Sequence, residues 1–221
     1  LDAAATIAVA EHAGSVAALD RAITAAAAKL LQGGTLPCGE GRVAINLSGL
    51  SLMHAKQANQ LLTVLSSHAV DPARIVWELA ERHTLLPTRE VRANLDQLAS
   101  AGSAIALDDV GVACANLPLL AYVPVAYIKT DKILTRAIAH PNGGRGRALL
   151  DGLVRLVESV GAELIFEGVE DEHTFDAIRS GSPATAWIQG YAIAKPLSVQ
   201  SRIQPGSVAG TTDEASSART A

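Results

Sequence analysis

The 221-residue chain has few of the residues that mark secreted, thiolate-metal or membrane-spanning proteins. Its only cysteines, Cys38 and Cys114, lie far apart and outside any Cys-x-x-Cys pattern. This argues against a disulfide framework and fits two ordinary thiols in a reducing compartment. No apolar stretch approaches the length of a membrane-spanning helix, and residues 1–15 lack the basic start of a signal peptide. We therefore expect a cytoplasmic location without membrane contact.

Clusters of basic residues are also missing. The chain has 18 lysines and arginines against 22 aspartates and glutamates, a formal net charge of −4, and no Lys/Arg-rich run. This balance argues against a general surface for DNA, RNA or acidic membranes. The six histidines lack the spacing of metal ligands. Hydrophobic residues make up 49% of the chain, which is enough for one sizeable domain with its own core.

What the sequence does contain is a repeated strand–helix pattern. Two helical segments come first, 2–13 and 16–31, separated by Gly14 and by Ser15, which can cap the second helix. Apolar runs with strand character follow at 42–48, 74–81, 103–110, 125–131, 162–170 and 186–191, and the helices between them include 53–67, 88–100, 145–160 and 172–180. Because these runs are continuous rather than alternating, the pattern predicts a parallel α/β fold with strands buried on both faces.

The C-terminal segment differs in composition from the rest of the chain. Residues 199–221 are small and polar, which predicts a disordered tail. Residues 1–198 are then expected to form one α/β domain.

Each predicted strand carries polar residues near its C-terminal end. They are Asn46, Glu78, Glu81, Asp108, Asp109, Lys129, Asp131, Glu167, Glu170 and Gln189. In a parallel barrel all these ends open on the face that holds the active site. Carboxylate and amide oxygens without clustered His or Cys suit Mg²⁺ or Mn²⁺. Two such ions can hold a phosphodiester and activate a water, and they would offset the repulsion between Asp108 and Asp109.

Each of these residues also has a plainer interpretation. Asn46 could cap the following loop through its side chain, and Asp108 with Asp109 could form an Asx turn before Gly111. Lys129 could pair with Asp131 and have no further role. The shared position at strand ends favours one common site, because independent causes would have to place polar residues at six strand ends.

The segments at these ends resemble a known series of motifs. INLS, WELAE, LDDVG, YIKTD, FEGVE, and IQGY with KPLS after it are similar in order and spacing to those of the EAL domain family. That family comprises bacterial phosphodiesterases that open cyclic di-GMP to the linear dinucleotide. The resemblance covers roughly residues 1–198. It implies a TIM-like (β/α) barrel, cyclic di-GMP as the ligand, and Mg²⁺ or Mn²⁺ at a two-metal site.

The resemblance also implies roles at matching positions. The implied metal ligands are Asn46, Glu78, Asp108, Asp109 and Glu167. Lys129 would orient the hydrolytic water and balance charge, with help from Gln189. Glu81 would anchor the loop after Asp109, and Asp131 matches the acidic position that follows the lysine.

Two features depart from the family pattern. The sequence contains no Glu-Ala-Leu, the motif that names the family and supplies a metal-ligand glutamate. Residues 2–13 resemble the segment after this motif, so we expect the chain to begin just downstream of it and to lack the first two strands of an eight-stranded barrel. Residues 112–116 read Val-Ala-Cys-Ala-Asn where the family usually has Thr-Gly-Tyr-Ser-Ser. That loop normally links metal occupancy to dimer packing, which makes it the candidate contact of a homodimer.

Three functions remain open from the sequence. The first is metal-dependent hydrolysis of cyclic di-GMP. The second is a catalytically silent module that binds cyclic di-GMP and regulates a partner, favoured by the missing glutamate and by a loop whose lost glycine and hydroxyls predict weaker metal binding. The third is a Schiff-base aldolase that uses Lys129. The surrounding acids rank the third last, because they favour the protonated form of a lysine.

Overall fold

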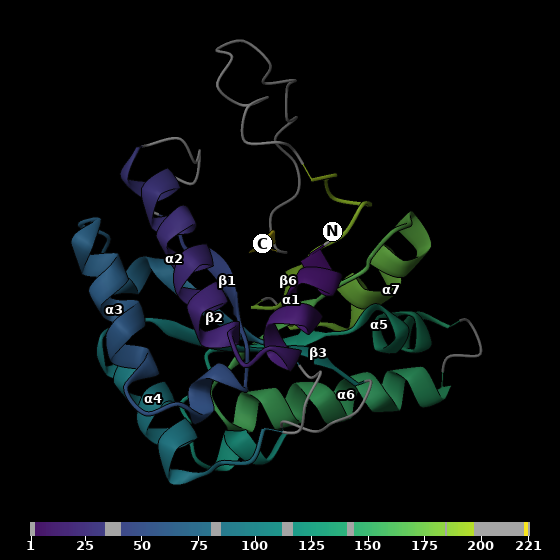
Figure 1. Cartoon of the computed structure of the whole chain (residues 1–221). Coiled ribbons are helices and arrows are strands. Elements are labelled where there is room, and N and C mark those ends of the chain that lie inside the picture. Colours follow the sequence, from purple (N-terminus) through teal and green to yellow (C-terminus); the bar gives the residue numbers. More distant parts are fainter. Residues whose placement is uncertain are drawn as a thin grey trace. The chain divides into compact units, whose positions relative to one another are not determined.

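The computed structural model describes most of the chain, in two compact units (Figure 1). The described residues are 3–33, 41–80, 85–111, 117–140, 144–183, 185–196 and 219–220. The first unit comprises Leu1–Leu107 and Ala115–Val125, and the second comprises Asp108–Cys114 and Ala126–Ala221. Strand β3 (Ala104–Val110) therefore begins in the first unit and ends in the second.

The first unit contains parallel strands and the helices that pack near them. β1 (Val43–Leu47), β2 (Ile75–Leu79) and the start of β3 pair in that order, with Trp77 opposite both Ile45 and Ile105. The helices are α1 (Ala3–His12), α2 (Val16–Gln32), α3 (Gln57–Ser67) and α4 (Arg89–Ser100), with the short 3₁₀ turns η1 (Ser51–Met53), η2 (Pro72–Arg74) and η3 (Leu117–Ala121). Figure 1 shows α2, α3 and α4 in succession, and each packs against the next.

Helix α4 shows how the sequence produces these elements. Thr88 lies at its N-cap, and its Oγ1 accepts a hydrogen bond from the Val91 amide at 3.3 Å. Val91, Leu95 and Leu98 recur at helical spacing and are fully buried. One apolar face therefore anchors the helix to the core, while its charged face meets solvent.

The second unit repeats the strand–helix alternation. β4 (Tyr127–Thr130), β5 (Glu163–Phe166), β6 (Trp187–Ile188) and β7 (Arg219–Thr220) pair in parallel in that order. The helices are α5 (Lys132–Ala139), α6 (Gly144–Ser159) and α7 (Glu172–Gly181). Asp171 caps α7, and its hydrogen bonds from the amide and then the hydroxyl of Thr174 lower the pKa of Asp171 below its ordinary value.

The prediction of a parallel α/β fold is confirmed, with a strand inside each of the six predicted ranges. Burial on both faces is wrong for β1, where Ala44 and Asn46 are exposed while Ile45 and Leu47 are buried. The prediction that Ser15 caps α2 through its side chain is also wrong. Its hydroxyl donates instead to the Ala10 carbonyl at 3.3 Å, back toward α1.

Two helices, α3 and α5, also differ from what the sequence predicted. The helix predicted over 53–67 begins only at Gln57, because η1 precedes it and Lys56 adopts a left-handed backbone with φ of 69°. Helix α5 was not predicted.

Two further expectations concern the C-terminal tail and the membrane. Of the predicted tail, the structure describes only Arg219–Thr220, as β7, so disorder of the remainder stays a prediction. Among the described residues, no helix is both long and apolar enough to cross a bilayer.

Candidate metal centre

Asp108 and Asp109 lie together where β3 ends. Successive strand side chains normally point to opposite faces, which would separate adjacent carboxylates. Asp109 instead adopts a left-handed backbone with φ of 57°, a conformation that aspartate tolerates better than most residues. The Asp109 amide donates to Oδ1 of Asp108 at 3.0 Å. This local turn lets both side chains reach the same group of acids.

Lys129 on β4 joins the ends of β3 and β5 within the second unit. Its residue is only 5% exposed. Its Nζ lies 3.0 Å from Oδ1 of Asp108 and 2.7 Å from Oε1 of Glu167, the first residue after β5. A buried ammonium is stable only where acceptors compensate for its lost hydration. The two ion pairs provide that compensation and fix Asp108 and Glu167 relative to each other.

Three carboxylates converge beside this lysine. One oxygen from each of Asp108, Asp109 and Glu167 lies within 4.8 Å of the others, and all three residues are half-buried. Together with Lys129 the group has a formal charge of −2. Oxygen-only donors of this charge are the ligand set that hard divalent cations such as Mg²⁺ and Mn²⁺ prefer. The residues present therefore fit such a cation.

The first unit holds two of the other predicted ligands. Asn46 on β1 and Glu78 on β2 stand opposite each other in the parallel register. Asn46 is exposed and Glu78 is half-buried. The structure thus brings these two side by side, and it separately brings Asp108, Asp109 and Glu167 together in the second unit.

Three further predictions concern loops. Glu81 and residues 112–116 lie outside the described residues, so their predicted roles are not tested. Gln189 is exposed just after β6. Its backbone amide donates to the carbonyl of Phe166 at 2.8 Å, and its backbone carbonyl accepts from the amide of Val169 at 3.3 Å. These backbone bonds hold Gln189 beside the loop that carries Glu167.

Asp131 has a structural task that the sequence alone could have indicated. Its Oδ1 accepts from the Ile133 amide at 2.6 Å, so it caps α5, and its own amide donates to Val110 at 3.1 Å. An aspartate directly before an amphipathic run is a standard N-cap signal. Glu170, another predicted strand-end acid, forms an exposed ion pair with Arg136 of α5.

Gly168 allows the loop that carries Glu167 to pack against α5. Its φ is 68°, and a Cβ added there would collide with the Cβ of Lys132 in the first turn of that helix. We expect Gly168→Ala to lower the free energy of unfolding by about 2 kcal/mol, from backbone strain and overpacking. Urea denaturation measures this. Gly152→Ala is the control, because its Cβ would meet nothing within 4 Å inside α6. Equal midpoints for Gly168→Ala and wild type would contradict the expectation.

Comparison with curated proteins identifies relatives that are longer than this chain. The bifunctional diguanylate cyclase/cyclic di-GMP phosphodiesterase MucR of Pseudomonas aeruginosa is 26% identical over 156 residues, which cover 70% of this chain and 22% of MucR. The cyclic di-GMP phosphodiesterase PdeL of Escherichia coli is 29% identical over 155 residues, 70% of this chain and 42% of PdeL. The chain therefore spans less than half the length of either relative.

Solved structures share the fold. Klebsiella pneumoniae BlrP1 in complex with manganese and cyclic di-GMP superposes with a TM-score of 0.68 at 28% identity, covering 80% of this chain and 44% of that one. The PaMucR phosphodiesterase in complex with cyclic di-GMP gives a TM-score of 0.75 at 22% identity, covering 89% and 78%. Residues 1–196 match the EAL domain family. With that match covering nearly the whole chain, and with the TIM-like fold in common, the protein belongs to the EAL domain family.

Proposed function

We propose that this chain hydrolyses cyclic di-GMP to the linear dinucleotide in a metal-dependent reaction, as part of a bacterial signalling protein in the cytoplasm. The observation that carries the proposal is the meeting of Asp108, Asp109 and Glu167 around Lys129. MucR and PdeL are named as cyclic di-GMP phosphodiesterases, and BlrP1 was solved with cyclic di-GMP and manganese. These relatives support the choice of cyclic di-GMP as substrate and of manganese as metal.

The side chains at this site would have two roles, metal binding and positioning. Asp108, Asp109 and Glu167 would hold Mg²⁺ or Mn²⁺ through carboxylate oxygens. Such ions, when bound, polarise a phosphodiester and make a bound water a nucleophile. Lys129 keeps Asp108 and Glu167 in place and can donate a hydrogen bond to a water or phosphate oxygen beside them. An ammonium paired with two carboxylates is not the free amine that Schiff-base chemistry requires, which disfavours the aldolase.

Four further assignments rest on the family resemblance. Asn46 and Glu78 as additional ligands, Gln189 as a support for Lys129, and Glu81 as an anchor for the loop after Asp109 stay predictions. So does a homodimer formed through that loop.

The test is an assay of the whole chain with cyclic di-GMP and Mn²⁺, with the linear product separated by chromatography. We expect product with Mn²⁺ and none with EDTA. The competing function, a silent cyclic di-GMP-binding module, is favoured by the sequence of residues 112–116, which lacks the glycine and hydroxyls of the family pattern. Metal-supported binding of cyclic di-GMP without product would establish that function instead. If the chain neither binds cyclic di-GMP nor forms product, both functions are refuted.

A calorimetric titration tests the metal site independently of turnover. Asp109→Asn removes one of the three converging carboxylates, so we expect Mn²⁺ affinity to fall by about tenfold or more. Asp176→Asn removes the same charge from an exposed position on α7 and is the matched control. If both variants bind Mn²⁺ like the wild type, the proposed centre is wrong.

A further inference from the structure

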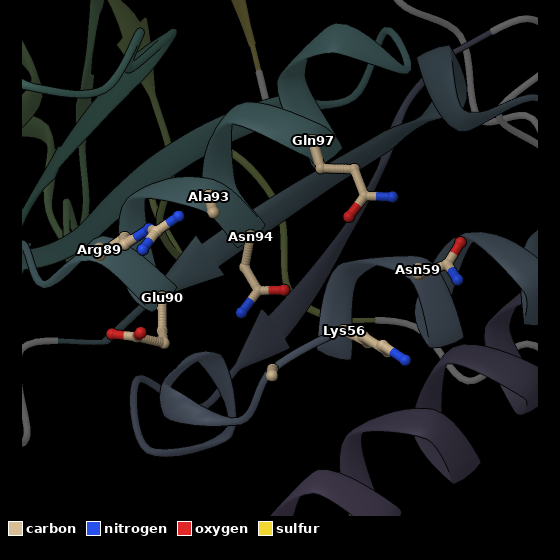
Figure 2. Close-up of a pocket in the computed structure, with 8 residues that line it drawn as sticks. Lys56, Asn59, Arg89, Glu90, Ala93, Asn94 and Gln97 are labelled. Carbon is tan, nitrogen blue, oxygen red and sulfur yellow. The ribbon is translucent and has the colours of Figure 1, made fainter.

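A groove lies in the first unit, between α3 and α4. This α3–α4 groove is open to solvent and has a volume of about 470 Å³, which is typical of sites for small molecules. Figure 2 shows Arg89 and Glu90 on one side of it, Lys56 and Asn59 on the other, and Asn94 between them. None of these residues belongs to the carboxylate cluster, so the groove is a different site from the candidate metal centre.

The floor of the groove is formed by Asn94, whose side chain is held by three hydrogen bonds. Asn94 is only 4% exposed, and its Oδ1 accepts from the Ala58 amide at 2.9 Å. Its Nδ2 donates to the carbonyls of Leu52 at 2.8 Å and His54 at 3.0 Å. One side chain of α4 therefore fixes the start of α3 and sets the width of the groove. Two alanines beside it, Ala55 and Ala93, leave the space unfilled.

The walls present positive charge and hydrogen-bond donors. Lys56 and Arg89 are exposed, and within the described part of the chain neither side chain pairs with a carboxylate or makes a hydrogen bond. Lys56 stands at the N-cap of α3 and Arg89 is the first residue of α4. The positive ends of the two helix dipoles add partial positive charge to that of the side chains. Among the described residues that line the groove, Glu90 is the one acid.

The backbone at Lys56 gives a further indication. Its φ of 69° is left-handed, a conformation that costs a non-glycine residue about 1 kcal/mol. Glycine would avoid this cost but would remove the ammonium. Strain of this kind is concentrated at binding sites, where the side chain is needed.

We propose that the α3–α4 groove binds a small anion, a phosphate- or carboxylate-bearing metabolite, between Lys56 and Arg89, with the side-chain amides of Asn59 and Gln97 as further donors. The site does not depend on the hydrolytic function. Because its cations are exposed, binding should weaken as salt concentration rises.

The test is a titration of the whole chain in EDTA, so that the carboxylate cluster carries no metal. Inorganic phosphate and citrate are titrated in turn at constant ionic strength, and binding is followed by backbone amide NMR shifts of α3 and α4. We expect saturable shifts at the starts of both helices. Tighter binding of phosphate would assign a phosphorylated ligand, and tighter binding of citrate would assign a polycarboxylate.

Two variants test the residues. Arg89→Gln and Lys56→Gln each remove one charged hydrogen bond, so each should weaken binding about tenfold. Lys29→Gln removes the same charge from an exposed site on α2 and should bind like the wild type. The proposal is overturned by non-saturable shifts with both anions, by equal binding in wild type and both groove variants, or by an equal loss in Lys29→Gln.

Discussion

Lys129→Met is expected to lower the rate of cyclic di-GMP hydrolysis by at least about a hundredfold, because it removes a charged donor from the reaction centre. The same change should lower the free energy of unfolding of the metal-free chain by about 3 to 5 kcal/mol. The physical reason is that methionine leaves Asp108 and Glu167 without the ammonium that lies 3.0 Å and 2.7 Å from their oxygens. Rates are measured by product chromatography, and stability by urea denaturation in EDTA.

A structural role alone would predict that activity is lost only because the fold is lost. The two roles separate when Mn²⁺ is added, since a divalent cation can replace the missing positive charge among the carboxylates. We expect Mn²⁺ to restore the stability of Lys129→Met but not its turnover. Lys132→Met is the control, because this exposed lysine lies three residues away and its Cβ, which meets Gly168, is retained. Full turnover in Lys129→Met would exclude a part for this lysine in the reaction.

The sequence predicted the strands well because each is an apolar run that ends in polar residues. It missed α5, although Asp131 carries the capping signal, because the strand and the helix follow each other without a glycine or proline between them. It also misjudged Ser15, whose hydroxyl is drawn back to the Ala10 carbonyl. Such choices between alternative hydrogen bonds depend on geometry that residue types do not specify.

For the candidate metal centre, the sequence named the three converging carboxylates and Lys129, but it did not separate them from Asn46 and Glu78 and did not give their geometry. Their positions at strand ends predicted that Asp108, Glu167 and Lys129 share one site, and in the structure Lys129 forms ion pairs with both acids. The convergence of Asp108 and Asp109 at the end of the strand was expected, but the left-handed backbone at Asp109 that produces it was not, because strand periodicity alone would send that carboxylate to the other face. The pairing of Asn46 with Glu78 follows from strand register, which needs the observed alignment of β1 with β2.

A buried acid on α2 escaped the sequence reasoning altogether. Asp20 is 4% exposed, and its Oδ2 accepts from the Ser48 amide at 3.3 Å in the loop after β1. Burial raises the pKa of Asp20 to about 6, and the nearby Glu11 adds to the rise. Hydrogen bonds from Ser51 and Ser48, and the charge of Arg21, oppose it. In the sequence Asp20 occupies one ordinary position in a helix, and only packing reveals that it is enclosed.

The enclosure of Asp20 predicts how stability depends on pH. A carboxyl whose folded pKa of about 6 exceeds its ordinary 3.8 binds its proton more tightly in the folded chain than in the unfolded chain. The stability that this proton contributes is therefore fully present below pH 3.8 and is lost as the pH rises to 6. The loss amounts to about 3 kcal/mol at pH 8. Asp20→Asn retains the shape and the acceptor without the charge. We therefore expect it to be more stable than wild type by about 2 to 3 kcal/mol at pH 8 and nearly equal to it at pH 4.

Urea denaturation of both proteins across this pH range measures the difference, and taking the difference cancels the titration of all other groups. Asp96→Asn on the exposed side of α4 removes the same charge and should show no such pH dependence. A gap between Asp20→Asn and wild type that stays constant from pH 4 to pH 8 would show that Asp20 keeps its ordinary pKa in the folded chain. A widening gap would show that the loop after β1 is held by a carboxylate whose charge opposes folding at neutral pH.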